Sequence, residues 1–397
     1  MRIFMRVTKT IFLHIILDLS IISCAENIKG EKKKLIKASV PKKITALPKI
    51  VKAPLDNPAS VEKEILGKLL FFDPILSGNK DVACATCHHP KNGYTEFLDL
   101  SIGPNAMGVG SKRKFNVPND IPFVKRNAQT IINTAFNGID ENNRYDAETA
   151  AMFWDKRIES LEKQALEPIK AFEEMRGHGI TEIEILQNVI DRLNDIPEYQ
   201  KLFELAFGEK DAITVENLGK AIATFERTLI SNNSRFDQYK RGKHDAITIS
   251  EKEGMELFKS VGCINCHNGP MFSDYQLHVI GTPENNRLPI PDAGVEDTFA
   301  FQTPSLRNRR FTAPYMHNGS FQNLRRVLEF YEDISNGKIR NKNVSTKRYD
   351  PFVRELELSV KEMSLIISFL NTLKDDSFDK EIPESVPSGL QVGGDIQ

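Results

Sequence analysis

The chain has 397 residues, of which 40% are hydrophobic and 27% charged, so it has the composition of a globular protein with room for two domains. Its formal net charge of −1 argues against nucleic acid or another polyanion as a partner.

The first 23 residues have the pattern of an export signal. An apolar run at 11–22 leads to Cys24 and follows a basic start made of Arg2, Arg6 and Lys9. The run is too short for a comfortable membrane span. It resembles a bacterial lipoprotein signal, in which Cys24 would be lipidated. A plain signal peptide with an incidental cysteine is the alternative.

Both alternatives predict export, so we expect the protein on the periplasmic side of a bacterial envelope. The lipoprotein signal further predicts attachment to a membrane, only through a lipid anchor at Cys24. Residues 24–55 contain many lysines and prolines and few large apolar side chains. This composition predicts a flexible tether between the anchor and a folded body.

The pattern of the first folded part, which we place at 56–240, is mainly helical. A short helix is expected from Val61, and the Gly-, Asn- and Pro-rich stretch 90–143 favours loops. Apolar residues at helical spacing predict further helices at 150–169, 186–207 and 215–230.

The second folded part is placed at 241–375, with the domain boundary near 235–248. Ser250 and Glu253 have the spacing of a capping box and predict a helix start. A loop is expected at 283–304, helices at 324–331 and 360–373, and a loose polar tail at 376–397. Since alternating strand patterns are scarce, the predicted fold class is mainly α with few short strands.

Two copies of the pattern C-x-x-C-H carry the chemistry of the chain. They are Cys84–His88 and Cys263–His267, and each is an attachment signal for a c-type haem. Two cysteines can bond the vinyl groups of one porphyrin while the histidine binds the iron. A zinc site would explain the cysteines but not a histidine after both pairs. We therefore predict two covalent haem c groups, one in each of two cytochrome c-like helical domains, with His88 and His267 as proximal ligands.

The surrounding segments resemble those of bacterial di-haem cytochrome c peroxidases and their MauG-type relatives. The resemblance runs from about Pro58 to Leu373. The segments that resemble the peroxidatic half of the family are Arg126-Asn127, 153–157, 161–164, Pro168-Ile169 and Glu174-Met175. Those that resemble its electron-transfer half are 303–308 and 312–319.

The resemblance assigns roles around the first haem. Glu174 matches the distal glutamate, which can take a proton from peroxide and return it to the leaving oxygen. Gln164 and Pro168 match residues that line the same pocket. Trp154 matches the tryptophan between the two haems, although a tryptophan on an apolar face can equally be a core residue.

The resemblance also implies a calcium ion between the domains, held by Asn127, Thr312 and Pro314 through oxygen atoms that suit a hard cation. At the second haem, the position of the usual methionine ligand is occupied by Tyr331, as in MauG-type proteins. Tyr331 is the predicted sixth ligand, and Met316 is the alternative.

Histidine placement predicts an accessible first haem. Many peroxidases of this family hold a histidine on the resting peroxidatic iron, but this sequence has none between His89 and His178. We therefore expect the first haem to be open in the oxidised state. His178, His244 and His278 are interpreted as solvated surface residues.

These features predict an enzyme that reduces hydrogen peroxide to water, with electrons from a small donor protein (a cytochrome c or a cupredoxin) entering at the second haem. One alternative is a MauG-type oxidase that stores two oxidising equivalents in a high-valent state and acts on a protein or other substrate. Another is a non-catalytic di-haem electron carrier. The family resemblance also makes a homodimer possible.

Overall fold

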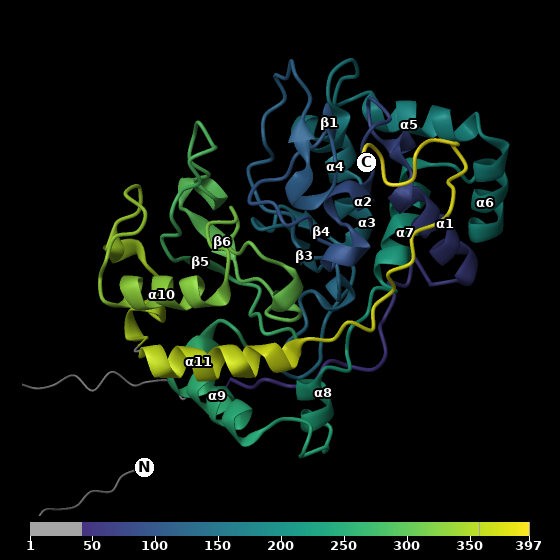
Figure 1. Ribbon diagram of the computed structural model, residues 1–397. Helices are drawn as coiled ribbons and strands as arrows, with labels where there is room; N and C mark the ends of the chain where they lie inside the picture. The colour runs from purple at the N-terminus through teal and green to yellow at the C-terminus, as the bar shows by residue number, and fades with distance from the viewer. Residues whose placement is uncertain (1–41, 357, 397) are drawn as a thin grey trace, which may run out of the picture. The chain divides into compact units, whose positions relative to one another are not determined.

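The computed structural model describes residues 42–356 and 358–396 (Figure 1). The predicted export signal, Cys24 and the first part of the tether lie outside these residues. Within the described ranges, no helix is both long enough and apolar enough to cross a bilayer.

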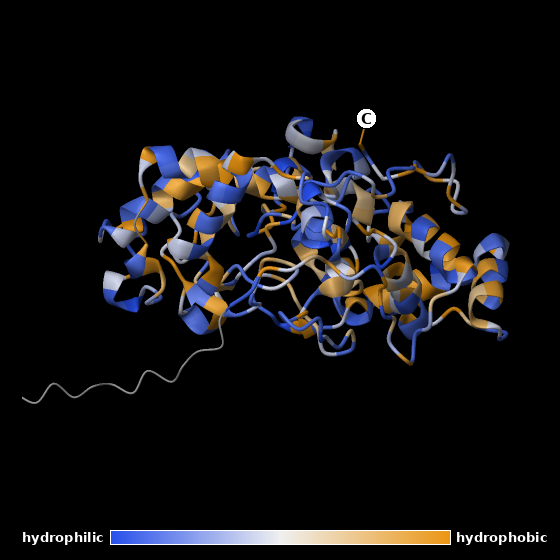
Figure 2. Cartoon of the chain, turned by 90° about the horizontal axis from the view of Figure 1, so that it is seen from below, coloured by the Kyte–Doolittle hydropathy of each residue, from blue (hydrophilic) through white to orange (hydrophobic). Residues whose placement is uncertain are grey.

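The fold is mainly helical, as predicted. The longer helices are α1 (Val61–Phe72), α5 (Ile185–Asn194), α6 (Pro197–Phe207), α7 (Val215–Glu226), α9 (Ile249–Ser260), α10 (Leu324–Ser335) and α11 (Val360–Leu370). The shorter ones are α2 (Cys84–Cys87), α3 (Leu161–Gln164), α4 (Glu167–Lys170), the π-turn η5 (Phe172–Arg176) and α8 (Arg235–Lys240). Figure 2 shows hydrophobic and hydrophilic residues side by side on the same helices, as expected where one face of a helix is buried.

The strands form three small antiparallel pairs. They are β1 (Ala106–Met107) with β2 (Lys114–Phe115), β3 (Ala151–Met152) with β4 (Ile158–Glu159), and β5 (Leu277–Val279) with β6 (Ala300–Gln302). Each pair joins loop segments and none forms a larger sheet among the described residues.

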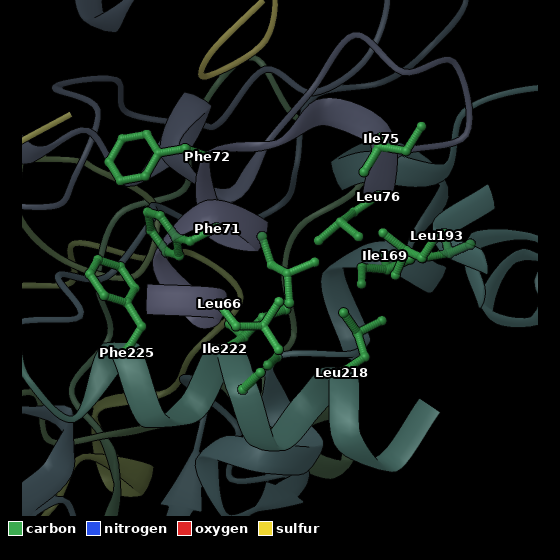
Figure 3. Close-up of a cluster of buried hydrophobic side chains, with 14 of the residues drawn as sticks. Leu66, Phe71, Phe72, Ile75, Leu76, Ile169, Leu193, Leu218, Ile222 and Phe225 are labelled. Carbon is green, nitrogen blue, oxygen red and sulfur yellow. The ribbon is translucent and has the colours of Figure 1, made fainter. Parts of the chain in front are cut away.

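The first core forms where α1 packs against α7 (Figure 3). Ser60 caps α1 by accepting a hydrogen bond from the backbone N–H of Lys63, and Leu66 and Leu70 are fully buried. Gly67 allows the close approach, because a Cβ there would lie 2.0 Å from the Ala221 carbonyl oxygen. Each fully buried leucine contributes about 1.5–3 kcal/mol, so this contact fixes the elements on which the first haem motif rests.

The second core forms where α9 packs against α11. Gly254 has the same function as Gly67, since a Cβ there would lie 2.1 Å from the Leu365 carbonyl oxygen. Phe236 of α8 is fully buried in this core. The sequence assigned α8 to the first domain, whereas its aromatic side chain packs with the second.

The single helix predicted at 150–169 is wrong. The segment forms the β3–β4 hairpin, followed by the short helices α3 and α4. Phe153, Lys156 and Ser160 have positive φ values, which a right-handed helix cannot contain. The apolar residues have helical spacing, but the buried ones belong to different elements: Met152 lies in the hairpin and Leu161 in α3.

Two other helix boundaries also differ from the sequence prediction. Pro197 starts α6 and separates it from α5, where one continuous helix was expected. The capping box of α9 is made by Thr248 and Glu251, two residues earlier than the predicted pair.

The loose tail predicted at 376–397 is also wrong for the described residues. After α11, the chain returns to the first half of the molecule (Figure 1), where Phe378 and Val386 are buried in the first core. The hydroxyl of Thr86, inside the first haem motif, donates to the Gly393 carbonyl at 2.7 Å. Backbone hydrogen bonds from Gly393 to Phe72 and from Asp395 to Asp81 also hold this segment. Such bonds cannot be predicted from the polar side-chain composition of the segment.

The described part of the predicted tether packs against the folded body before residue 55. Ile44 and Leu47 are buried, and the Leu47 N–H donates to the Asp237 carboxylate at 3.0 Å.

Candidate functional site

The first haem motif lines a cavity of about 380 Å³. Cys84 and Cys87 form α2, and His88 ends it. The Nδ1 atom of His88 lies 3.1 Å from the Tyr94 carbonyl oxygen. A carbonyl can only accept, so Nδ1 donates and Nε2 is left for a metal, an arrangement usual among metal-binding histidines. Burial lowers the pKa of His88, which favours the neutral ring that a ligand needs.

The second motif repeats this arrangement in a cavity of about 150 Å³. Cys263, Cys266 and His267 all line the cavity. Nδ1 of His267 donates to the Phe272 carbonyl oxygen at 2.9 Å, and burial lowers the pKa of His267 to about 4. Both histidines are therefore oriented by the turn that follows them, which fits two haem sites of the same kind.

Glu174, Gln164 and Pro168 line the first cavity, so the structure brings the predicted peroxidatic residues together. They come from η5, α3 and α4. Burial, and after it the nearby charge of Glu173, raises the pKa of Glu174 to about 7. A carboxyl with such a pKa can both accept and donate a proton near neutral pH.

A shared wall separates the two cavities. Its members line both of them: Trp154, Gln302, Thr303, Pro304, Arg309, Tyr315 and Met316. Trp154 is buried, and its indole N–H donates to the Asn127 carbonyl at 3.1 Å. Trp154 therefore lines both cavities, and its position between two haems stays a prediction.

Three buried nitrogen atoms near this wall have no hydrogen-bond partner among the described residues. They are Nε of Arg309, Nε2 of Gln302 and Nε2 of His317. All three residues line one or both cavities. Nε of Arg309 and Nε2 of Gln302 are donors, and unpaired buried donors are costly, whereas the role of Nε2 in His317 depends on the tautomer. The two donors fit a ligand that carries acceptor groups, such as the propionates of haem.

Sequence reasoning missed Arg309 and Gln302, because isolated polar residues in loops are usually solvated. It quoted His317 only as part of a motif. No local pattern distinguished them, since their role depends on a cavity formed by distant segments.

Asn127, Thr312 and Pro314, the predicted calcium ligands, also line the first cavity. The Asn127 side chain donates through Nδ2 to the Leu98 carbonyl at 2.6 Å, so that Oδ1 is the atom it could offer to a cation. Its backbone N–H donates to the His317 carbonyl at 2.6 Å, which ties this residue to the segment carrying Thr312 and Pro314.

Tyr331 and Met316, the two candidates for the sixth ligand, both line the second cavity. Tyr331 comes from α10. Burial, followed by the neighbouring Cys266 and Cys263, raises the pKa of the Tyr331 phenol.

One of the three histidines interpreted as solvated is not. The side chain of His278 is only 12% exposed and lies between Asp274 and Asp350. His178 and His244 are exposed, as expected, and His178 pairs with Asp120 at 3.0 Å.

Comparison with known proteins identifies the family. The sequence model of the di-haem cytochrome c peroxidases matches residues 61–245. The methylamine utilization protein MauG of Methylorubrum extorquens is 34% identical over 342 residues, which cover 85% of each chain. This chain belongs to the di-haem cytochrome c peroxidase and MauG family. Membership implies two haems, which agrees with the paired motifs.

Both branches of the di-haem family are similarly close. Cytochrome c551 peroxidase of Nitrosomonas europaea is 32% identical over 339 residues, covering 84% of this chain and 86% of its own. A solved MauG-like protein associated with microbial copper homeostasis aligns with a TM-score of 0.66 and 27% identity, covering 83% of this chain and 95% of its own. The family is therefore established, whereas identity alone does not separate peroxidase from MauG activity.

Proposed function

We propose that this family member is a cytochrome c peroxidase, which converts hydrogen peroxide, two electrons and two protons to two waters. The observation that carries the proposal is the difference between the two cavities. The first is lined by the half-buried Glu174, whose pKa is raised, whereas Tyr331, which can close an iron, lines only the second.

When bound, the haem at Cys84 and Cys87 supplies the redox-active iron. Glu174, in its ionised form, would accept a proton from one oxygen of hydrogen peroxide. It then returns this proton to the leaving oxygen, which departs as water. Gln164 offers a hydrogen bond to the ligand or to Glu174, and Pro168 shapes the wall of the cavity.

A small cytochrome c or cupredoxin would deliver electrons at the second cavity, where Cys263, Cys266 and His267 would hold the haem and Tyr331 would be a further protein ligand. Trp154, which contacts both cavities, is the proposed relay to the first. The calcium ion proposed at Asn127, Thr312 and Pro314 would fix the two halves against each other. The proposed location is the periplasmic side of the envelope, with lipidation at Cys24.

A MauG-type oxidase, which withdraws electrons from a protein substrate, is the second candidate. Tyr331 in the second cavity and the 34% identity to MauG favour it. Mixing the purified protein with peroxide and reduced mono-haem cytochrome c separates the two candidates. Rapid, sustained oxidation of the cytochrome supports the peroxidase, and loss of peroxide without cytochrome turnover supports the oxidase.

A substitution of Glu174 tests the acid–base role. Glu174→Gln keeps the shape but cannot exchange the proton, so we expect the peroxide rate constant to fall by about 10²–10⁴-fold with both haems retained. Glu216→Gln on α7 is the matched control, because that carboxylate is exposed and pairs with Lys220 at 2.6 Å. Equal rates for Glu174→Gln and the control would refute the assignment.

A further inference from the structure

The side chain of His278, on β5, is enclosed by two carboxylates. Its Nε2 lies 3.0 Å from Asp274 and its Nδ1 lies 2.7 Å from Asp350. All three side chains are largely buried, with exposed fractions of 12% for the histidine, 11% for Asp274 and 18% for Asp350. We call these three residues the acid–histidine triad.

The geometry determines the charge of the acid–histidine triad. An ionised carboxylate can only accept hydrogen bonds, so both ring nitrogens must donate and the ring is an imidazolium. Burial opposes this charge, whereas the hydrogen bonds to Asp274 and Asp350 favour it and raise the pKa of His278; the Cys266 thiol also raises this pKa, a contribution that ends when Cys266 is bonded to haem. One positive and two negative charges give the triad a net charge of −1.

The triad lies at the edge of the second haem cavity. His278 lines this cavity, and its Nδ1 lies 4.0 Å from the Sγ atom of Cys266. The backbone N–H of Asp274 donates to the Cys266 carbonyl at 2.8 Å. Once Cys266 is bonded to haem, the histidine and the two carboxylates satisfy one another, so the cluster is not a metal site.

The triad also connects to the segment that covers the cavity. The backbone N–H of Asp350 donates to the Val279 carbonyl at 2.9 Å, and Phe352 and Val353, which follow it, line the cavity. The charges are therefore held in place by contacts on both sides.

We propose that the acid–histidine triad places a fixed net negative charge beside the second haem and thereby lowers its reduction potential. A nearby negative charge stabilises the ferric state, and net charge around a haem is one of the means by which proteins set its potential. A lower potential makes the second haem a stronger electron donor to the first. The proposal rests on haem attachment at Cys263 and Cys266 and is independent of the reaction at the first haem.

The test is a spectroelectrochemical titration of the full di-haem protein at pH 8, well above the ordinary carboxyl pKa of about 4. Asp350→Asn keeps an acceptor for Nδ1 but brings the triad to zero charge, so the potential of the second haem should rise. His278→Gln removes the cation and leaves two negative charges, so the same potential should fall.

The signs of the two shifts in reduction potential distinguish an effect of charge from an effect of packing. If the residues merely seal the cavity, both substitutions admit water and shift the potential in the same direction. Asp274→Asn is a second neutralising variant and should match Asp350→Asn. Glu256→Gln on α9 is the control. It also removes one negative charge, but at an exposed side chain, so it should leave the potential unchanged. Shifts of the same sign, or no shift in the triad variants, would overturn the proposal.

Discussion

At the scale of single residues, burial gives Glu174 its proposed chemistry. Its carboxyl faces the first cavity, and the pKa is raised to about 7 because burial and the charge of Glu173 both disfavour the ionised form. Arg157 opposes the shift but is less effective than either. A group with this pKa changes its protonation state within the range in which enzymes usually work.

The pH dependence of the peroxide reaction follows from this raised pKa. Below pH 7, Glu174 holds its proton and cannot accept another, so the rate constant should increase with pH and level off above about 7. Stopped-flow measurements of peroxide reacting with the ferric protein would check this. The profile of Glu174→Gln should lack the titration, and an unchanged profile in that variant would assign it to another group.

Residue-level prediction from the sequence is most specific where the signal is local. The two haem motifs identify their own ligands, since cysteines and histidine must be adjacent in the chain to bind one porphyrin. The resemblance then located Glu174, Gln164 and Trp154, all of which line the first cavity. His278 was wrongly interpreted as solvated, and Arg309 was missed. In both cases the side chain is surrounded by residues that are distant in the sequence.

At the scale of elements, a glycine sets the position of η5. Gly103 lies so close to this turn that a Cβ would be 2.2 Å from the Glu173 carbonyl oxygen and 2.6 Å from that of Glu174. Arg113 fixes the glycine by donating to its carbonyl at 2.7 Å and to the carbonyl of Asp395, in the C-terminal segment, at 2.8 Å.

Gly103→Ala should therefore displace Glu174 and slow the peroxide reaction. A displacement of about 1 Å at a reacting group can cost on the order of 10²-fold in rate. Gly254→Ala is the matched control, because it crowds the α9–α11 contact to a similar degree in the other core. Both variants should lose about 1–3 kcal/mol of unfolding free energy, measured by denaturant titration. An equal slowing in both would mean that stability, and not the position of η5, is the cause.

The observed helix and strand boundaries show what the spacing of apolar residues cannot predict. Helices with one buried face, such as α1 and α7, were expected at their observed places. The β3–β4 hairpin was taken for a helix, because apolar spacing does not reveal the positive φ values of Phe153 and Lys156. The C-terminal segment was taken for a loose tail, because backbone hydrogen bonds leave no trace in side-chain composition.

At the scale of the whole molecule, the two haem motifs line two different cavities, and these cavities share one wall. Among the described residues that line the first cavity, His88 is the only histidine. The second cavity is lined by His267 and Tyr331, neither of which lines the first. We therefore predict one iron with an accessible face and one with two protein ligands.

Cyanide titration of the ferric protein as isolated, followed by electron paramagnetic resonance, tests this asymmetry most directly. Cyanide binds a ferric haem only where a coordination position is free or easily vacated. We predict that one haem per chain converts to a cyanide complex without prior reduction, while the signal of the other is unchanged. Binding at neither haem would indicate a closed electron carrier, and binding at both would contradict the proposed sixth ligand; either result would contradict the account.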